Sequence, residues 1–457
     1  MKKHHSNRSM FSGKLGFVLS AAGASVGLGN IWRFPYLAAK YGGGIFLLIY
    51  ILLALTFGYT MIVAETSLGR MTRKSPVGAY ASFTKSHTLK AGGWINAIIP
   101  ILIVPYYSVI GGWVIKYLFE YICGNGTKLA EDGYFSMFIS DGVSAEICFV
   151  VFALITLTII FAGVRNGIER VSKFMMPILV VLSVIIAIYS VTRPGALKGI
   201  QYFLVPNLEN FSWMTVVSAM GQMFYSLSIA MGILVTFGSY MKKETSIENS
   251  TRNVEVFDTA IAIMAGLMII PAVFAFSGGD PNTLQAGPSL MFITIPKVFA
   301  SMGLGTVVGI LFFVLVLFAA VTSSIALTES AVSTFEDELH WNRKKSTVVI
   351  GIIMLALGTL SSLGYGPLDA VKILGMQFLD FFDFLTNSVM MPIAAIATCL
   401  LVSRVIGVDR IEEEMTQKGG TFRRKKIFVM MIKYLCPVFA AIILISSVMN
   451  AFGLISM

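Results

Sequence analysis

Eleven apolar runs divide the sequence, each of them long enough to cross a lipid bilayer. A membrane-spanning helix needs about 20 predominantly apolar residues. Only 13% of the 457 residues are charged and 56% are hydrophobic, a composition that excludes an ordinary soluble protein. We therefore predict an all-α polytopic membrane protein with eleven transmembrane helices. The expected spans are 15–40, 44–68, 92–123, 145–163, 171–190, 213–241, 254–277, 302–335, 347–363, 371–402 and 428–452.

Lysine and arginine residues gather in alternate loops between these runs. The N-terminal tail 1–14 is basic, and the last basic loop, 403–427, alone holds seven such residues, whereas the opposite loops hold four in total. Basic loops stay on the cytoplasmic side. We therefore expect a multi-pass protein of the plasma (inner) membrane with a cytoplasmic N-terminus and, after an odd number of spans, an extracytoplasmic C-terminus. The net charge of +10 thus reflects topology in a lipid bilayer, and we expect no nucleic-acid partner.

The first apolar run is interrupted at its centre by residues that do not suit a lipid-exposed helix. Between positions 22 and 35 it contains Gly23, Gly27, Gly29, Asn30 and Arg33. Irregular backbone at membrane depth is tolerated only where it lines a protein-enclosed cavity, and an intramembrane charge indicates a functional site. A glycine-rich helix packed closely on its neighbours is the simpler alternative, but Arg33 counts against it. We therefore expect an ion and substrate site here.

The sixth run shows a second interruption of the same kind. It contains Gly221, Gln222, Ser226, Ser228 and Gly232 near its midpoint. Taken alone, the two serines could simply bond back to the preceding helical turn. However, the first and sixth runs begin two successive sets of five, and paired interruptions at corresponding positions point to the binding site of a transporter.

These residues resemble a known family of transporters. The segment 22–35, Gly221-Gln222 with 226–232, and Thr322-Ser323-Ser324 in the eighth run are similar to the neurotransmitter:sodium symporters, in particular to their bacterial amino-acid-transporting branch of the leucine-transporter type. The resemblance implies two inverted five-helix repeats, 15–190 and 213–402, with helices 1 and 6 unwound at mid-membrane, and an extra helix 11 at 428–452. In one departure from the family pattern, we expect no twelfth span. The implied activity is sodium-coupled symport by alternating access.

The resemblance also implies two sodium sites built from oxygen ligands. Thr322 and Ser323 are adjacent hydroxyls deep in an apolar run, although each could instead bond within its own helix. The first sodium site would be formed by Ser25, Asn30, Ser226 and Asp258, together with the substrate carboxylate. The second would be formed by Gly23, Val26, Ala319, Thr322 and Ser323.

Asp258 departs from the family archetype, which has Asn at this position. A carboxylate inside an apolar run needs a cation partner, so the substitution suits a sodium ligand. In chloride-dependent relatives the anion compensates positive charge near the first sodium site, and Asp258 would supply a fixed negative charge instead. We therefore expect transport to be independent of chloride.

A zwitterionic amino acid suits the expected substrate site. Its carboxylate would meet freed amides near Leu28 and Gly29 and the Tyr107 hydroxyl, and its ammonium would meet carbonyls of the two broken helices. Monoamine transporters would be expected to carry an Asp at Gly27. The implied site is apolar and uncharged, which favours a hydrophobic or aromatic side chain. The substrate residues expected are Ala24, Leu28, Gly29, Ile103, Tyr107, Tyr225, Ser226, Ser228, Met231, Ser323 and Leu327.

Charge pairs are expected to gate the two mouths of the site. By resemblance, Arg33 is the outer gate arginine and Asp383 its partner, with Asp380 as the competing assignment. The inner pair would be Arg8 and Asp337, with Tyr240 nearby. Such pairs should be weak, because each must break in every cycle and exposed pairs are worth about 0–1 kcal/mol.

The sequence also bears on functions other than symport. An enzyme would need convergent nucleophile, base or metal ligands, and neither the histidines, which lie outside the apolar runs, nor the scattered cysteines supply them. A proton-coupled amino-acid permease of the same architecture and a non-transporting amino-acid sensor remain alternatives. The expected ligands are a small-molecule amino acid and two sodium ions.

Overall fold

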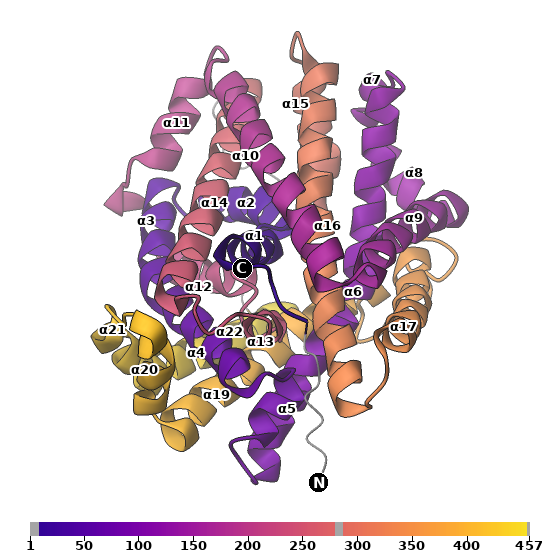
Figure 1. Cartoon of the computed structure of the whole chain (residues 1–457). Coiled ribbons are helices and arrows are strands. Elements are labelled where there is room, and N and C mark those ends of the chain that lie inside the picture. Colours follow the sequence, from indigo (N-terminus) through magenta and orange to yellow (C-terminus); the bar gives the residue numbers. More distant parts are fainter. Residues whose placement is uncertain (1–8, 279–286, 455–457) are drawn as a thin grey trace.

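The computed structural model describes residues 9–278 and 287–454, and within these ranges the regular secondary structure is helical (Figure 1). Nine described helices are long and apolar enough to cross a membrane, or ten with the bent pair Lys14–Ser25 and Gly29–Lys40. The predicted span 213–241 is not among them, because it is divided into two helices, Trp213–Ser226 and Ile233–Ser239, each too short to cross a membrane alone. The all-helical membrane class is thus confirmed, and the total of eleven spans stays a prediction.

The first half of the chain forms five spans and short connecting helices. Several spans contain π-helical turns, which frequently mark functional sites; the label η denotes these turns and also the two 3-10 helices η4 and η9. The elements are α1 (Lys14–Ser25), η1 (Gly29–Arg33), α2 (Phe34–Lys40), α3 (Gly44–Leu53), η2 (Ala54–Gly58), α4 (Tyr59–Thr72), α5 (Pro76–Ala81), α6 (His87–Ile122), α7 (Gly126–Leu129), α8 (Tyr134–Ser140), α9 (Gly142–Phe161), η3 (Val164–Glu169), α10 (Arg170–Val191), α11 (Ala196–Leu204) and η4 (Leu208–Asn210).

The second half contains the other broken span and the C-terminal helices. Its elements are α12 (Trp213–Ser226), α13 (Ile233–Ser239), α14 (Ile247–Ser277), η6 (Leu290–Thr294), α15 (Ile295–Ala300), α16 (Gly305–Glu338), α17 (Arg343–Leu363), α18 (Phe378–Asp383), η7 (Phe384–Met390), α19 (Met391–Leu400), η8 (Leu401–Ile406), α20 (Val408–Thr416), η9 (Gln417–Gly419), α21 (Lys425–Met430), η10 (Met431–Leu435) and α22 (Cys436–Ala451).

The tenth span begins later than its apolar pattern predicts. Residues 371–377 form a tight turn, closed by a bridge between Ile373 and Met376, and α18 starts at Phe378. Leu374 and Gly375 both have positive φ, at 52° and 78°, so no helix can run through them. Apolar composition alone did not reveal this turn.

The broken first span lies at the centre of the molecule. α1 packs against α10, α14 and α16, and in Figure 1 these helices surround it. The two halves of the other broken span divide between neighbours, since α12 packs on α3 and α13 on α4. The long helices α6 and α16 pack along each other. Polar backbone groups at the two breaks are therefore enclosed by protein, as irregular backbone at membrane depth requires.

Candidate substrate and sodium site

The break in the first span follows directly from its glycines. α1 ends at Ser25, the ψ of 88° at Val26 leaves the helical region, and the helix resumes at Gly29 after a bend of 54°. A Cβ at Gly27 would lie 2.7 Å from the Ser323 hydroxyl oxygen, and one at Gly29 would lie 2.5 Å from the Tyr225 ring. Glycine at these two positions lets the unwound backbone approach its neighbours closely.

The break in the second span contains three left-handed residues. Ser228, Ala230 and Gly232 have φ angles of 53°, 59° and 71°. Ala230 therefore unwinds in spite of its Cβ, and its amide donates a 2.8 Å hydrogen bond to the buried Glu65 carboxylate. The Ser228 hydroxyl donates to the Ala24 carbonyl at 3.0 Å. This last bond joins the two breaks to each other.

A small cavity of about 30 Å³ lies between the two breaks, and all eleven predicted substrate residues line it. The Tyr107 hydroxyl reaches the first break, where it accepts a 3.3 Å hydrogen bond from the Leu28 amide. The sequence prediction missed Ile233, which adds a further apolar wall. No charged side chain is among the described residues that line the cavity: Ala24, Ser25, Gly27, Leu28, Gly29, Asn30, Ile103, Tyr107, Tyr225, Ser226, Ser228, Met231, Ile233, Ser323 and Leu327.

A buried carboxylate lies beside this cavity. Asp258 is fully buried on α14 and accepts hydrogen bonds from the Asn30 amide at 2.8 Å, the Tyr50 hydroxyl at 2.9 Å and the Ser226 hydroxyl at 2.8 Å. Asn30, Ser226 and Asp258, predicted from segments far apart in the sequence, thus meet. Ser25 lies nearby on the cavity wall, and its hydroxyl bonds back to the Ala21 carbonyl. Tyr50 was missed, although its polar tip inside an apolar run was a signal.

A second oxygen-rich cluster joins the end of α1 to α16. The Ser323 hydroxyl oxygen lies within hydrogen-bond distance of three carbonyl oxygens, those of Gly23 at 3.2 Å, Ala24 at 3.1 Å and Val26 at 3.4 Å. The Thr322 hydroxyl donates to the Ala319 carbonyl at 3.1 Å, and a Cβ at Gly23 would lie 3.1 Å from the Thr322 Cβ. All five residues predicted for the second sodium site are thereby brought together, with only carbonyl and hydroxyl oxygens as potential ligands.

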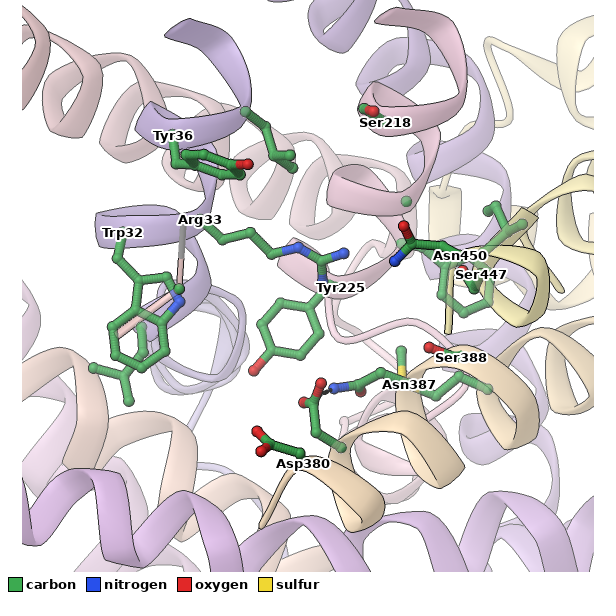
Figure 2. A pocket seen from close by; sticks show the side chains of 18 of the residues that line it. Trp32, Arg33, Tyr36, Ser218, Tyr225, Asp380, Asn387, Ser388, Ser447 and Asn450 are labelled. Carbon is green, nitrogen blue, oxygen red and sulfur yellow. Dashed lines mark hydrogen bonds between the residues drawn. The ribbon is translucent and has the colours of Figure 1, made fainter. Parts of the chain in front are cut away.

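The predicted outer gate lines a larger vestibule of about 360 Å³ above the cavity. Figure 2 shows Arg33 extending into this space beside Tyr225, whose ring centre is 5.4 Å from the guanidinium. Asp383 accepts hydrogen bonds from Asn387 at 2.5 Å and Tyr106 at 3.2 Å. In the described part of the chain no ion pair within 4 Å joins Arg33 to either Asp383 or Asp380. Their pairing stays a prediction.

The predicted inner gate is only partly within the described residues. Arg8 lies outside them, while the Asp337 carboxylate accepts a 2.6 Å hydrogen bond from the Ser75 amide. The Tyr240 hydroxyl donates to Glu329 at 2.7 Å. Glu329 is fully buried on α16 and pairs with Arg343 at 2.5 Å. This ion pair was missed, although a lone carboxylate in an apolar run could have indicated it.

An aromatic cluster surrounds Phe11 near Tyr240, a residue of the predicted inner gate. Phe11, 1% exposed, contacts the rings of Phe17, Phe237 and Tyr240 with centroid separations of 5.5–6.0 Å. Leu28, Tyr107 and Tyr225 line both the cavity and the vestibule. The central cavity is therefore adjacent to the vestibule, and the four rings of the aromatic cluster are not part of its lining.

Two broken helices around a central cavity, with oxygen-rich clusters at both breaks, define a membrane transporter of the leucine-transporter fold. The family comparison agrees with this class. Residues 8–127 and 136–454 match the model of the sodium:neurotransmitter symporter family, and the chain belongs to that family. It is accordingly a sodium-dependent symporter and not an enzyme.

Several relatives align over nearly the whole chain. The uncharacterized sodium-dependent transporter YhdH of Bacillus subtilis is 34% identical over 98% of both chains. The human sodium- and chloride-dependent GABA transporter 2 is 26% identical over 90% of this chain and 75% of its own length. Among solved structures, that of MhsT in complex with L-phenylalanine covers 96% of this chain and 100% of its own, with 34% identity and a TM-score of 0.86. The predicted family and fold are thus confirmed.

Proposed function

We propose that this symporter imports hydrophobic or aromatic amino acids together with sodium and independently of chloride. The observation that carries the proposal is the cavity between the two breaks, whose described lining is uncharged and which adjoins the carboxylate of Asp258. Ile103, Met231, Ile233 and Leu327 supply apolar surface for a substrate side chain. The structure of MhsT is a complex with L-phenylalanine, which supports the same substrate class.

The substrate backbone would lie across the two breaks. Its carboxylate would face the Leu28 amide and the Tyr107 hydroxyl, and its ammonium would take carbonyls freed where the helices unwind, including that of Ala24. A monoamine is disfavoured as substrate because position 27 is Gly, where a monoamine transporter would be expected to carry Asp. The backbone here leaves little room for such a side chain, since a Cβ at Gly27 would lie 2.7 Å from the Ser323 hydroxyl oxygen and 3.2 Å from that of Tyr107. Met231 is flexible and would repack around bulky rings.

Two sodium ions would occupy the two oxygen clusters. The first would bind among Ser25, Asn30, Ser226 and Asp258, close to the substrate carboxylate. The second would replace the hydrogen bonds that now hold α16 to the end of α1, using Gly23, Val26, Ala319, Thr322 and Ser323. Because the second ion would bridge two helices, its release would free α1 to move.

Asp258 supports the proposed chloride independence. Its carboxylate already receives hydrogen bonds from Tyr50, Asn30 and Ser226, so the donors that a chloride ion would need are engaged by a fixed negative charge. The predicted gates would operate on either side, Arg33 with Asp383 on the outer side and Arg8 with Asp337 on the inner side. The N-terminus would be cytoplasmic, and the vestibule of about 360 Å³ would then open outward.

Uptake into proteoliposomes tests this proposal. With an inward sodium gradient, labelled phenylalanine, tryptophan and leucine should accumulate, lysine should not, and gluconate in place of chloride should change nothing. Uptake driven equally well by a proton gradient in choline would identify a proton-coupled permease instead. Sodium-dependent binding without any accumulation would identify a non-transporting sensor.

A further inference from the structure

The last span carries basic residues in two different environments. Arg424 forms a bidentate pair with Glu255 at 2.9 Å, and Lys425 pairs with Glu412 at 2.5 Å, so both cations are neutralised within the protein. Lys426 and Lys433 are exposed, and neither forms an ion pair or hydrogen bond with the described residues. The ammonium groups of these two lysines are therefore available to an anion from outside the protein.

Lys426 and Lys433 both lie on the exposed side of the last span. Seven residues rise about 10 Å along a helix axis at about 1.5 Å per residue. Lys433 lies within the π-helical turn η10, a kind of distortion that is frequent at functional sites. A long lysine side chain at membrane depth extends its ammonium back toward the interface. The Lys433 ammonium can thus approach the level of Lys426.

The helix surface beyond these lysines is exposed and apolar. Met430, Tyr434, Val438 and Ile445 are 48%, 67%, 52% and 59% exposed, while Ile432, Cys436 and Ala440 on the other side are buried. The apolar stripe runs about 18 Å from Lys433 to Ile445, slightly more than half of a hydrocarbon core about 30 Å thick. Its polar end, with two ammonium groups and the Tyr434 hydroxyl, thus lies next to a surface that suits an acyl chain.

We propose that Lys426, Lys433 and Tyr434 form a binding site for one anionic glycerophospholipid on the face of α21, η10 and α22. The phosphate would bind between the two ammonium groups, and the Tyr434 hydroxyl would hydrogen bond to the headgroup or glycerol oxygens. The acyl chains would lie along Val438 and Ile445. Charge complementarity selects an anionic lipid, and the length of the apolar stripe selects a lipid over free phosphate.

The position of the site suggests what the lipid stabilises. The neighbouring Arg424 also donates a 3.1 Å hydrogen bond to the Leu55 carbonyl of η2 and lies over the Tyr59 ring at 4.1 Å. Glu412 and Glu414 of α20 pair with Lys425 and with Arg70 of α4. In Figure 1, α20 and α21 lie together at the edge of the molecule, beside α4. A lipid bound here would hold the last span against α4 and α14.

Native mass spectrometry of the purified full-length protein tests the site. We expect the wild type to bind phosphatidylglycerol more tightly than phosphatidylcholine. The double variant K426Q/K433Q should bind phosphatidylglycerol about 30-fold more weakly than the wild type, since each lysine near an anionic headgroup contributes about a factor of 5 in affinity. The control K85Q/K344Q removes two exposed basic residues elsewhere and should keep wild-type affinity. K426R/K433R, which keeps both charges, should keep most of it.

Three outcomes would overturn the proposal. Equal phosphatidylglycerol affinity of K426Q/K433Q and the wild type would show that these lysines do not bind the lipid. An equal loss in K85Q/K344Q would show a general effect of surface charge. Binding of glycerol phosphate as tight as that of phosphatidylglycerol would show that the apolar stripe contributes nothing and that the ligand is a soluble phosphate.

Discussion

Replacing Asp258 by Asn removes one buried charge while nearly preserving shape. Asp258 is fully buried and receives hydrogen bonds from Asn30, Tyr50 and Ser226 at 2.8–2.9 Å. A sodium ion about 4 Å from a carboxylate gains about 4 kcal/mol at an effective dielectric constant of about 20, which corresponds to about 1,000-fold in affinity. The amide oxygen of Asn still serves as a ligand, so we expect the sodium concentration for half-maximal binding to rise by about 30- to 1,000-fold.

Scintillation proximity measurements of phenylalanine binding over a sodium titration would measure this effect. The matched control is Glu146→Gln, which neutralises another carboxylate of a membrane-spanning helix, one that accepts a hydrogen bond from Thr359 at 2.5 Å. The control should shift the half-maximal sodium concentration by less than about twofold. An Asp258→Asn protein that binds phenylalanine at the wild-type sodium concentration would refute the assignment of Asp258 as a sodium ligand.

Three further predictions concern the backbone, the inner ion pair and the anion. Gly29→Ala should lower phenylalanine affinity at least about tenfold in an equilibrium binding assay, because the added Cβ would lie 2.5 Å from the Tyr225 ring. The control is Gly221→Ala, which should bind phenylalanine normally, since a Cβ at Gly221 meets nothing within 4 Å. Glu329→Gln should destabilise the protein by about 3 kcal/mol in a thermal unfolding assay, because Arg343 loses its buried partner; an unchanged midpoint would contradict this. Chloride should stimulate phenylalanine binding by Asp258→Asn but not by the wild type, since only the variant lacks the fixed negative charge. Equal responses of the two proteins to chloride would show that Asp258 does not take the place of chloride.

The broken helices could be predicted because their cause is local. Gly27 and Gly29 at membrane depth, and Ser228 to Gly232 in the sixth run, conflict with a continuous lipid-exposed helix in any fold. The meeting of Asn30, Ser226 and Asp258 was likewise expected, since a resemblance to a known family supplies the tertiary arrangement that a pattern of apolar residues lacks.

The features that were missed depend on tertiary contacts or on turns within apolar sequence. Tyr50 and Glu329 each contact partners that are more than ten residues distant in the chain, Asp258 and Arg343 respectively. Composition assigns such residues to a span without showing what they face. The turn before α18 was missed because Leu374, a residue favourable in helices, adopts a positive φ there. In the outer vestibule, the resemblance supplied Arg33 and Asp383 but not their side-chain conformations.

Phenylalanine binding to the purified wild-type protein in sodium and in choline tests the central claim most directly. We expect saturable binding at one site in sodium and at least about 100-fold weaker binding in choline, because both oxygen clusters adjoin the cavity and Asp258 would lack its cation. Equally tight binding in the two salts would contradict the proposed sodium coupling, since the clusters at the two helix breaks would then not link sodium binding to substrate binding.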